Sequence, residues 1–300
     1  MQKKKQTQGY LCILLAGILW GSIGLFVNLL KAQGTEPSTI AFLRIGTAAL
    51  LLVPILLASG GLQMFRIPWR GLAACAALGV FCQAFFNVSY NLSIQNVGVA
   101  TASVLLYSSP IFVCVMSKVF FHEKIGRIKQ AALLINICGC ILTVTNGDFS
   151  AITFSVLGAV TGILAGFLYA LMTIISKTAT ENYHPLTVLF YSFVFGAAVL
   201  ALTADPWENL AAAGSLRFTL TAFGYGLIPT VGSYIFYLRG LGCNLETSKV
   251  PVLASVETVV SALIGILIFK ESVGIFKFVG IVCVLVSIAV MNGEKSDTDA

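Results

Sequence analysis

Long apolar stretches alternate with short polar connections along almost the whole chain. Ten of these stretches are close to the length of about 20 residues that lets a helix cross the hydrocarbon of a bilayer. They cover residues 10–30, 37–58, 69–92, 97–120, 127–146, 153–176, 185–203, 216–238, 246–269 and 274–292. The connections leave no room for a soluble domain. The pattern therefore predicts an all-α integral membrane protein with ten transmembrane helices.

Composition supports this prediction and excludes soluble functions. Apolar residues make up 58% of the chain, charged residues 10%, and the mean hydropathy is +0.94, so a water-soluble surface cannot be built. Nucleic-acid binding is excluded on the same ground. The first stretch follows Lys3, Lys4 and Lys5, as a secretory signal would, but it is longer than a signal core and leads into another span. We interpret it as a retained helix.

The chain carries a repeated pattern. Residues 109–126 and 257–274 are each an apolar run that ends in a Glu and a Gly, and Glu123 and Glu271 stand 148 residues apart. Upstream, Pro37-x-Thr39-x-x-Phe42 matches Pro185-x-Thr187-x-x-Phe190 at the same offset, and Gly17 to Gly21 matches Gly162 to Gly166 with a shift of a few residues. Several matches in one register indicate a duplication. We expect repeats at 9–146 and 153–292, tails at 1–8 and 293–300, and a seam at Asn146–Ile152.

The number of spans in each repeat determines the orientation of the two repeats relative to each other in the membrane. Because five is odd, the second repeat enters the membrane from the opposite side, so the two five-helix repeats are expected to be inverted. An even total also places both termini on one side. Placing the termini in the cytoplasm leaves thirteen Lys and Arg residues at the inner face and four at the outer face. The inner set is Lys3, Lys4, Lys5, Arg66, Arg70, Lys118, Lys124, Arg127, Lys129, Lys177, Arg239, Lys249 and Lys295, and the outer set is Lys31, Arg217, Lys270 and Lys277.

These features resemble one known family. The matching segments are Ser109-Pro110 with His122 to Gly126, Glu257-Thr258 with Lys270 to Gly274, Pro37 to Arg44, and Glu246 to Lys249. They make the chain similar to the drug/metabolite transporter superfamily, EamA type, over Gly17 to Met291. The resemblance implies secondary transport, often export, of amino acids, related metabolites or drugs across the bacterial inner membrane. One departure is Thr258, because the family has Pro after this Glu, and a helix without Pro keeps its backbone bond there.

Two charged residues inside predicted spans mark a candidate site. Arg44 lies in the second span and Glu257 in the ninth, where such a charge costs about 2.5–3.5 kcal/mol. Either residue could line a polar cavity. Alternatively, Glu257 could make a hydrogen bond between helices, and Arg44 could snorkel or hold a neighbouring helix.

Polar stripes at helical spacing extend the candidate site. The third span carries Gln83, Asn87, Tyr90 and Asn91, and the eighth carries Thr230, Ser233, Tyr234 and Tyr237. They predict two walls of one pocket, although such residues also hold membrane helices together. The candidate substrate-binding residues are Trp20, Asn28, Arg44, Asn87, Tyr90, Tyr107, Pro110, Tyr234, Tyr237 and Glu257.

The expected mechanism is alternating access, in which a small polar or zwitterionic solute enters a cavity between the repeats. Glu257 would hold a substrate ammonium group or bind a coupling proton. We expect no catalytic residue, metal or cofactor, because the two histidines stand apart and the eight cysteines suit packing. The expected partners are the substrate and the lipid bilayer, with the protein a monomer or a homodimer. A polytopic enzyme or a passive channel remains the alternative.

Overall fold

The computed structural model describes residues 2–204, 206, 215–243 and 245–293, and within these ranges its regular elements are all helical. The elements of the first half are α1 (Gln2–Gly21), α2 (Ile23–Lys31), α3 (Pro37–Gly60), η1 (Gly61–Phe65), α4 (Trp69–Ala77), η2 (Leu78–Phe85), α5 (Phe86–Leu106), α6 (Ser109–Phe121) and α7 (Arg127–Thr145). After η3 (Phe149–Ala151), the second half contains α8 (Val156–Asn182), α9 (Pro185–Ala204), α11 (Leu216–Gly226), η4 (Leu227–Gly232), α12 (Ser233–Leu241), η5 (Thr247–Lys249), α13 (Val250–Ala254), α14 (Val256–Leu267) and α15 (Ile275–Gly293). Lys295 lies outside the described residues.

Eight stretches of the described chain are long and apolar enough to cross a membrane, which confirms a multi-pass membrane fold. One of them, Trp69–Phe121, contains two of the expected spans, and its helix breaks at Gly98, where φ is 75° and ψ is 167°. Glycine adopts a positive φ without steric penalty. The expected span at 216–238 corresponds to α11, η4 and α12 and is not among the eight. The number ten therefore stays a prediction.

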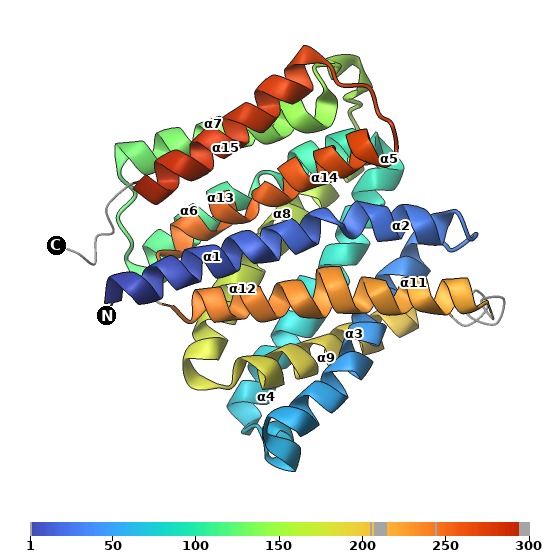
Figure 1. Cartoon of the computed structure of the whole chain (residues 1–300), viewed down its shortest axis with the longest axis vertical. Coiled ribbons are helices and arrows are strands. Elements are labelled where there is room, and N and C mark those ends of the chain that lie inside the picture. Colours follow the sequence, from blue (N-terminus) through green and yellow to red (C-terminus); the bar gives the residue numbers. More distant parts are fainter. Residues whose placement is uncertain (1, 205, 207–214, 244, 294–300) are drawn as a thin grey trace.

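The two halves run in opposite directions. Glu123, which follows α6, contacts Thr247 and Ser248 at the start of the stretch Thr247–Leu267, whereas Glu271 follows the end of that stretch. The two matched glutamates thus lie at opposite ends of one span. In Figure 1, α7 and α15 lie side by side, and α1 begins at the same end of the bundle at which α15 ends. This is the arrangement expected of inverted repeats.

Packing between the halves respects the same symmetry. The second span of each half packs against the other, α3 on α9, and so do the two fifth spans, α7 on α15. Helix α1 packs on α12 and α14, as α8 packs on α5 and α6. At the α7–α15 contact, a Cβ added to Gly280 would lie 2.6 Å from the Thr143 nitrogen and 2.7 Å from the Gly139 oxygen. Glycine is needed there because the two backbones approach so closely.

Helix interruptions occur at equivalent places in the two halves. The third span of each half contains a π-helical segment, η2 in the first and η4 in the second. The fourth span breaks at Tyr107 and Ser108, between α5 and α6, and the ninth breaks at Ser255, between α13 and α14. Ser255 is equivalent to Tyr107 under the offset of 148 residues. A break is therefore present two residues before Glu257 although Thr258 is not a proline.

The outer surface of the bundle is apolar. Leu50, Phe154 and Leu202 are 72%, 85% and 86% exposed. Water would make such exposure unfavourable across so many helices, but lipid does not. Many polar side chains are instead buried between the helices, and further polar groups line the cavity described next.

Candidate functional site

A cavity of about 270 Å³ lies in the middle of the bundle between the two halves. Helices α1, α2, α3 and α5 with the π-helical segment η2 contribute residues from the first half, and α8, α11, α12 and α14 contribute from the second. Its lining includes Lys31 and Pro37, which are exposed and flank the connection between α2 and α3, so the cavity reaches the surface at this end. We call this end of the bundle the mouth end. The volume is near the lower limit of ligand pockets, so the cavity suits a small solute.

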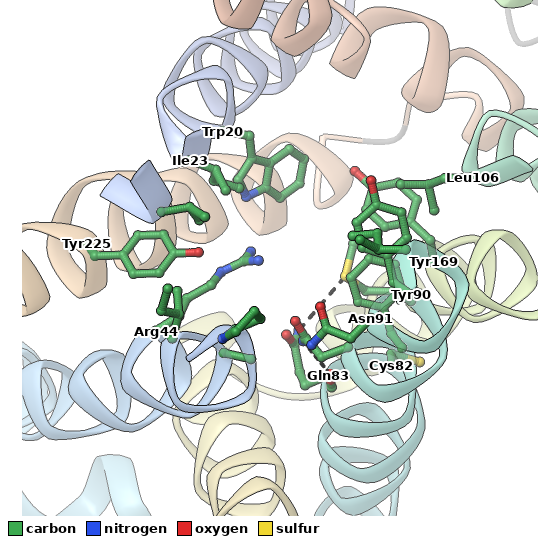
Figure 2. A pocket seen from close by; sticks show the side chains of 18 of the residues that line it. Trp20, Ile23, Arg44, Cys82, Gln83, Tyr90, Asn91, Leu106, Tyr169 and Tyr225 are labelled. Carbon is green, nitrogen blue, oxygen red and sulfur yellow. Dashed lines mark hydrogen bonds between the residues drawn. The ribbon is translucent and has the colours of Figure 1, made fainter. Parts of the chain in front are cut away.

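One wall presents hydrogen-bond donors that have no partner. Trp20 is only 4% exposed, and its indole nitrogen and the Nε of Arg44 are both buried without a hydrogen-bond partner. In Figure 2, the Trp20 indole nitrogen lies on the side of the ring that faces Arg44, and the Tyr225 hydroxyl faces the same guanidinium. Buried donors without partners are rare in native proteins, which makes this wall a place for a ligand acceptor.

The Trp20 ring is held in place by aromatic packing. Its centroid lies 5.4 Å from that of Tyr234 and 5.0 Å from that of Tyr237. Phe193 packs against the other side of Tyr234, at 5.2 Å. The contacts of Tyr234 with Trp20 and Phe193 are edge-to-face and that of Trp20 with Tyr237 is tilted, and together they give the Trp20 ring a defined orientation.

The opposite wall carries the polar stripe of the third span. Gln83 donates a hydrogen bond of 2.9 Å to the Tyr234 hydroxyl, which in turn donates to the Met172 sulfur at 3.3 Å. Asn87 donates to the Gln83 carbonyl oxygen at 2.6 Å. Tyr90 and Asn91 continue this wall (Figure 2). Because Gln83 and Tyr234 come from different halves, this chain of bonds joins the two halves at the cavity.

Glu257 supplies the negative charge of the cavity. It lies in the first turn of α14 and lines the cavity, and the positive charge of Arg44 acts on it. Among the described residues, the Glu257 side chain has no hydrogen bond and no ion pair within 4 Å. The site therefore contains one cation and one anion that do not pair with each other. An empty space between two opposite charges can accept a molecule that neutralises both.

The cavity brings together six of the ten residues predicted from sequence. These are Trp20, Arg44, Asn87, Tyr90, Tyr234 and Glu257. Asn28, Tyr107, Pro110 and Tyr237 do not line it. Their roles in substrate binding, inside or outside the cavity, stay predictions.

Helix breaks account for the positions of Asn28 and Tyr107, and the other two residues are buried in other contacts. Asn28 shares a helical face with Trp20 only if the helix is continuous, but the chain turns at Ser22 between α1 and α2, and Asn28 is exposed. Tyr107 lies in the break after α5, where its hydroxyl is 3.4 Å from the Thr258 hydroxyl. Pro110, in the first turn of α6, is buried. The Tyr237 hydroxyl bonds to Thr173 at 2.8 Å.

Sequence reasoning missed Tyr225, Tyr169 and Met172, which also line the cavity. Tyr225 precedes the π-helical segment η4, and a π-helix shifts the face on which later residues lie. Thr230 and Ser233, which belonged to the predicted stripe, bond to backbone oxygens of their own helix instead. No local pattern identifies Tyr225, because its position depends on this irregular turn.

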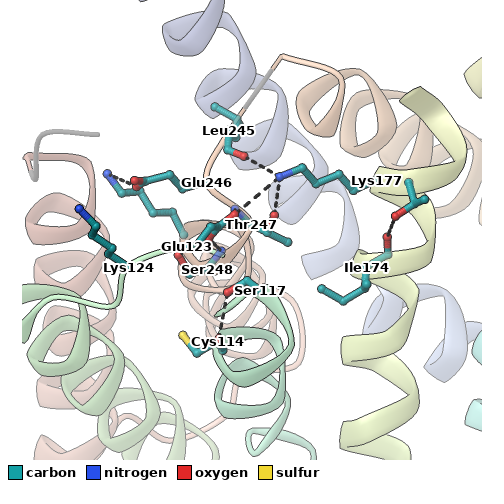
Figure 3. A network of polar contacts seen from close by, with 12 residues as sticks. Cys114, Ser117, Glu123, Lys124, Ile174, Lys177, Leu245, Glu246, Thr247 and Ser248 are labelled. Carbon is teal, nitrogen blue, oxygen red and sulfur yellow. Dashed lines mark hydrogen bonds and ion pairs between the residues drawn. The ribbon is translucent and has the colours of Figure 1, made fainter. Parts of the chain in front are cut away.

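A buried network of charges lies at the other end of the bundle, which we call the network end (Figure 3). The Glu123 carboxylate accepts hydrogen bonds from the backbone nitrogens of Thr247 and Ser248, at 2.5 and 2.9 Å, and from the Ser248 hydroxyl at 2.7 Å. Lys177 forms an ion pair with Glu123 at 3.6 Å and donates to the Thr247 hydroxyl at 2.7 Å. A negatively charged carboxylate beside the first backbone N–H groups of a helical segment interacts favourably with the dipole of that segment.

A second ion cluster belongs to the same network. Glu246 pairs with Lys129 at 3.1 Å and with Lys249 at 2.9 Å, and all three side chains are buried. The Lys129 ammonium also donates to the Lys124 carbonyl oxygen. Residues 123–129 belong to the first half and residues 177 and 246–249 to the second, so the network connects the halves. None of these residues lines the cavity.

Hydrogen bonding controls the ionisation of Glu123. Burial by itself raises the pKa of this carboxyl group, but the hydrogen bonds from Ser248 and Thr247 outweigh burial and lower the pKa below its ordinary value. The side chain therefore stays ionised at neutral pH and holds the start of the segment Thr247–Leu267.

Comparisons with known proteins agree with this picture. The sequence profile of the EamA-like transporter family matches residues 7–145 and 156–293. An uncharacterized transporter of Archaeoglobus fulgidus is 27% identical, over 94% of this chain and 95% of the relative. The uncharacterized inner membrane transporter YicL of Salmonella typhimurium is 26% identical, over 95% of each.

Two further proteins cover nearly the whole chain. The pseudopaline exporter CntI of Pseudomonas aeruginosa is 27% identical, over 96% of this chain and of the relative. A solved crystal structure superposes with a TM-score of 0.80 at 17% identity and covers 95% of this chain and 96% of its own. At that identity the superposition shows a shared fold.

Proposed function

Because the chain belongs to the EamA-like transporter family, we propose that it is a secondary active transporter that moves a small polar or zwitterionic solute by alternating access. Its relatives are named as transporters, and it is a transporter rather than an enzyme. We propose amino acids or related small metabolites as substrates and export across the bacterial inner membrane as the direction. The named exporter among the relatives supports export.

One observation carries this proposal. The central cavity opens at the mouth end, and at the other end the halves are joined by the network of Glu123, Lys177 and their partners. A carrier must have one closed end in every state, whereas a passive pore in its conducting state has none. The present state has its closed end where the network lies.

The internal repeat suggests how the closed end changes sides. Subtracting the 148-residue offset from Thr247 and Ser248 gives Val99 and Ala100, which begin the helical segment after the break at Gly98. The equivalent of Glu123 is Glu271, which is 52% exposed and paired with Lys277 at 2.8 Å. In the state that is closed at the mouth end, Glu271 would accept hydrogen bonds from the backbone N–H groups of Val99 and Ala100. Glu123 would then no longer be bonded to Thr247, Ser248 and Lys177.

The charge bias sets the proposed orientation. With the termini in the cytoplasm, the network end is the inner end and the mouth faces outward. Lys129, Lys177 and Lys249, all placed inside by the sequence, belong to the network end, and Lys31 lies at the mouth. The present state is then open to the outside and closed to the cytoplasm.

Counterflow tests the proposed function. Proteoliposomes are loaded with an unlabelled solute and mixed with its labelled form, over a panel of amino acids, amines and nucleosides. A carrier exchanges the two and accumulates label transiently above the equilibrium level, and Glu257→Gln should reduce this exchange at least tenfold. Net equilibration without overshoot for every solute that enters would indicate a channel and reject alternating access.

A further inference from the structure

We propose that the wall formed by Trp20, Arg44 and Tyr225 is a carboxylate-binding subsite, and that the substrate is an amino-acid-like zwitterion whose carboxylate lies there and whose ammonium group lies at Glu257. This inference rests on the proposed function, because it names the chemical class of the solute that the cavity carries.

The donor set is the first argument. Arg44 supplies a permanent positive charge whose Nε has no partner, and Trp20 supplies a buried N–H that also has none. An indole nitrogen can only donate, so its partner must be an acceptor. The Tyr225 hydroxyl accepts a hydrogen bond from the Arg44 guanidinium and keeps its own O–H to donate, so three donor groups surround one space (Figure 2). A carboxylate has two oxygens with about four acceptor sites and fits such a set.

Preorganisation is the second argument. The Trp20 ring is held by Tyr234 and Tyr237, so its N–H is directed before any ligand arrives. A structural tryptophan in this surrounding would place its N–H against a protein oxygen. A fixed donor that faces a cavity instead is the arrangement expected of a binding site.

Charge balance decides the class of ligand. A cation would neutralise Glu257 and leave Arg44 unbalanced, and an anion would do the reverse. Each unbalanced charge at this depth is unfavourable. A molecule with both charges neutralises both residues, which do not pair with each other in the described structure. The remaining lining, which includes Ile23, Phe86 and Tyr169, is suited to an apolar or aromatic substituent.

Binding to the purified full-length protein tests this assignment. The probes are L-leucine and L-phenylalanine, each compared with its amide, which lacks the carboxylate, and with its des-amino acid, which lacks the ammonium group. Isothermal titration gives a Kd for each. We expect the wild type to prefer the acid over the amide by about thirtyfold, as hydrogen bonds to a charged group imply.

Variants separate the two subsites. Arg44→Gln should lower the acid-to-amide ratio to about threefold or less, and Trp20→Phe, which keeps most of the ring packing, should lower it about three- to tenfold. Both should keep the preference for the ammonium group, which Glu257→Gln should remove. The matched controls are Arg217→Gln and Trp69→Phe, which change exposed residues outside the cavity and should leave every ratio unchanged. Gel filtration and melting temperature verify folding.

Three outcomes would overturn the inference. An unchanged acid-to-amide ratio in folded Arg44→Gln and Trp20→Phe would remove the carboxylate subsite. Equal binding of the amino acid and its des-amino analogue would indicate an anionic substrate. Failure of the wild type to bind either amino acid at 10 mM would reject the zwitterion assignment, while the carrier proposal would still be judged separately by counterflow.

Discussion

Replacing Glu123 by Gln should weaken the closed network end without removing any carbon packing. The Glu123 carboxylate, which is 10% exposed, accepts three hydrogen bonds from Thr247 and Ser248 and pairs with Lys177. Glutamine offers one acceptor oxygen, so one backbone N–H would face its NH₂ group, and the ion pair would be lost. A hydrogen bond to a charged group contributes about 1.5–3 kcal/mol, and an unsatisfied buried donor costs a similar amount.

Adding the lower values of these two contributions, we expect Glu123→Gln to destabilise the state closed at the network end by about 3 kcal/mol relative to the state open there. That loss raises the population open at the network end by about a hundredfold. The reporter is Cys114, which is 6% exposed and lies on α6 beside the network (Figure 3). With the other seven cysteines replaced, its reaction rate with a membrane-impermeant thiosulfonate measures opening.

The matched control is Glu271→Gln, the equivalent change at the opposite end. Because Glu271 does not contact the network, this variant should leave Cys114 labelling unchanged or slow it. Glu181→Gln, an exposed change on α8, controls for the loss of one carboxylate. If Cys114 reacts at the same rate, within twofold, in Glu123→Gln and in the unaltered reporter protein, the network does not keep this end closed and the reasoning is wrong.

Three further predictions follow from single contacts. The lowered pKa of Glu123 means that its stabilisation is complete above the ordinary value of 4.5 and is lost as the pH falls through the lowered pKa. The difference in Cys114 labelling rate between Glu123→Gln and the unaltered reporter protein should therefore be constant above pH 4.5 and shrink below it, and comparing the two proteins at each pH cancels the loss of reactive thiolate that slows both. Glu257→Gln should abolish or sharply reduce uptake into proteoliposomes, and an unchanged rate and pH profile would remove Glu257 from the mechanism. Gly280→Val should lower the melting temperature, because its Cβ would meet the Gly139 backbone, whereas Gly293→Val, where nothing lies within 4 Å, should not.

Much of the architecture could be predicted from the sequence because membrane proteins obey strong local constraints. Apolar runs of spanning length must be helices in lipid, and a duplication of odd span number must invert. Arg44 and Glu257 could be assigned to a common interior because a charge at that depth is unfavourable against lipid. Both line the cavity in the structure. The part of the stripe from Asn87 to Asn91 was readable because α5 remains regular there, although Gln83 lies in the π-helical segment η2.

Only the tertiary structure decided the details that depend on irregular turns and on distant contacts. The break at Ser22 moved Asn28 away from Trp20. The π-helical segment η4 lies between Tyr225 and Tyr234 and shifts the helical face of the residues after it, so that both tyrosines line the cavity. A pattern of regular helical spacing predicts neither effect. The pairing of Glu123 with Thr247 joins residues 124 positions apart in the chain. Such a contact depends on how the helices pack, and the residues next to Glu123 in the sequence do not predict it.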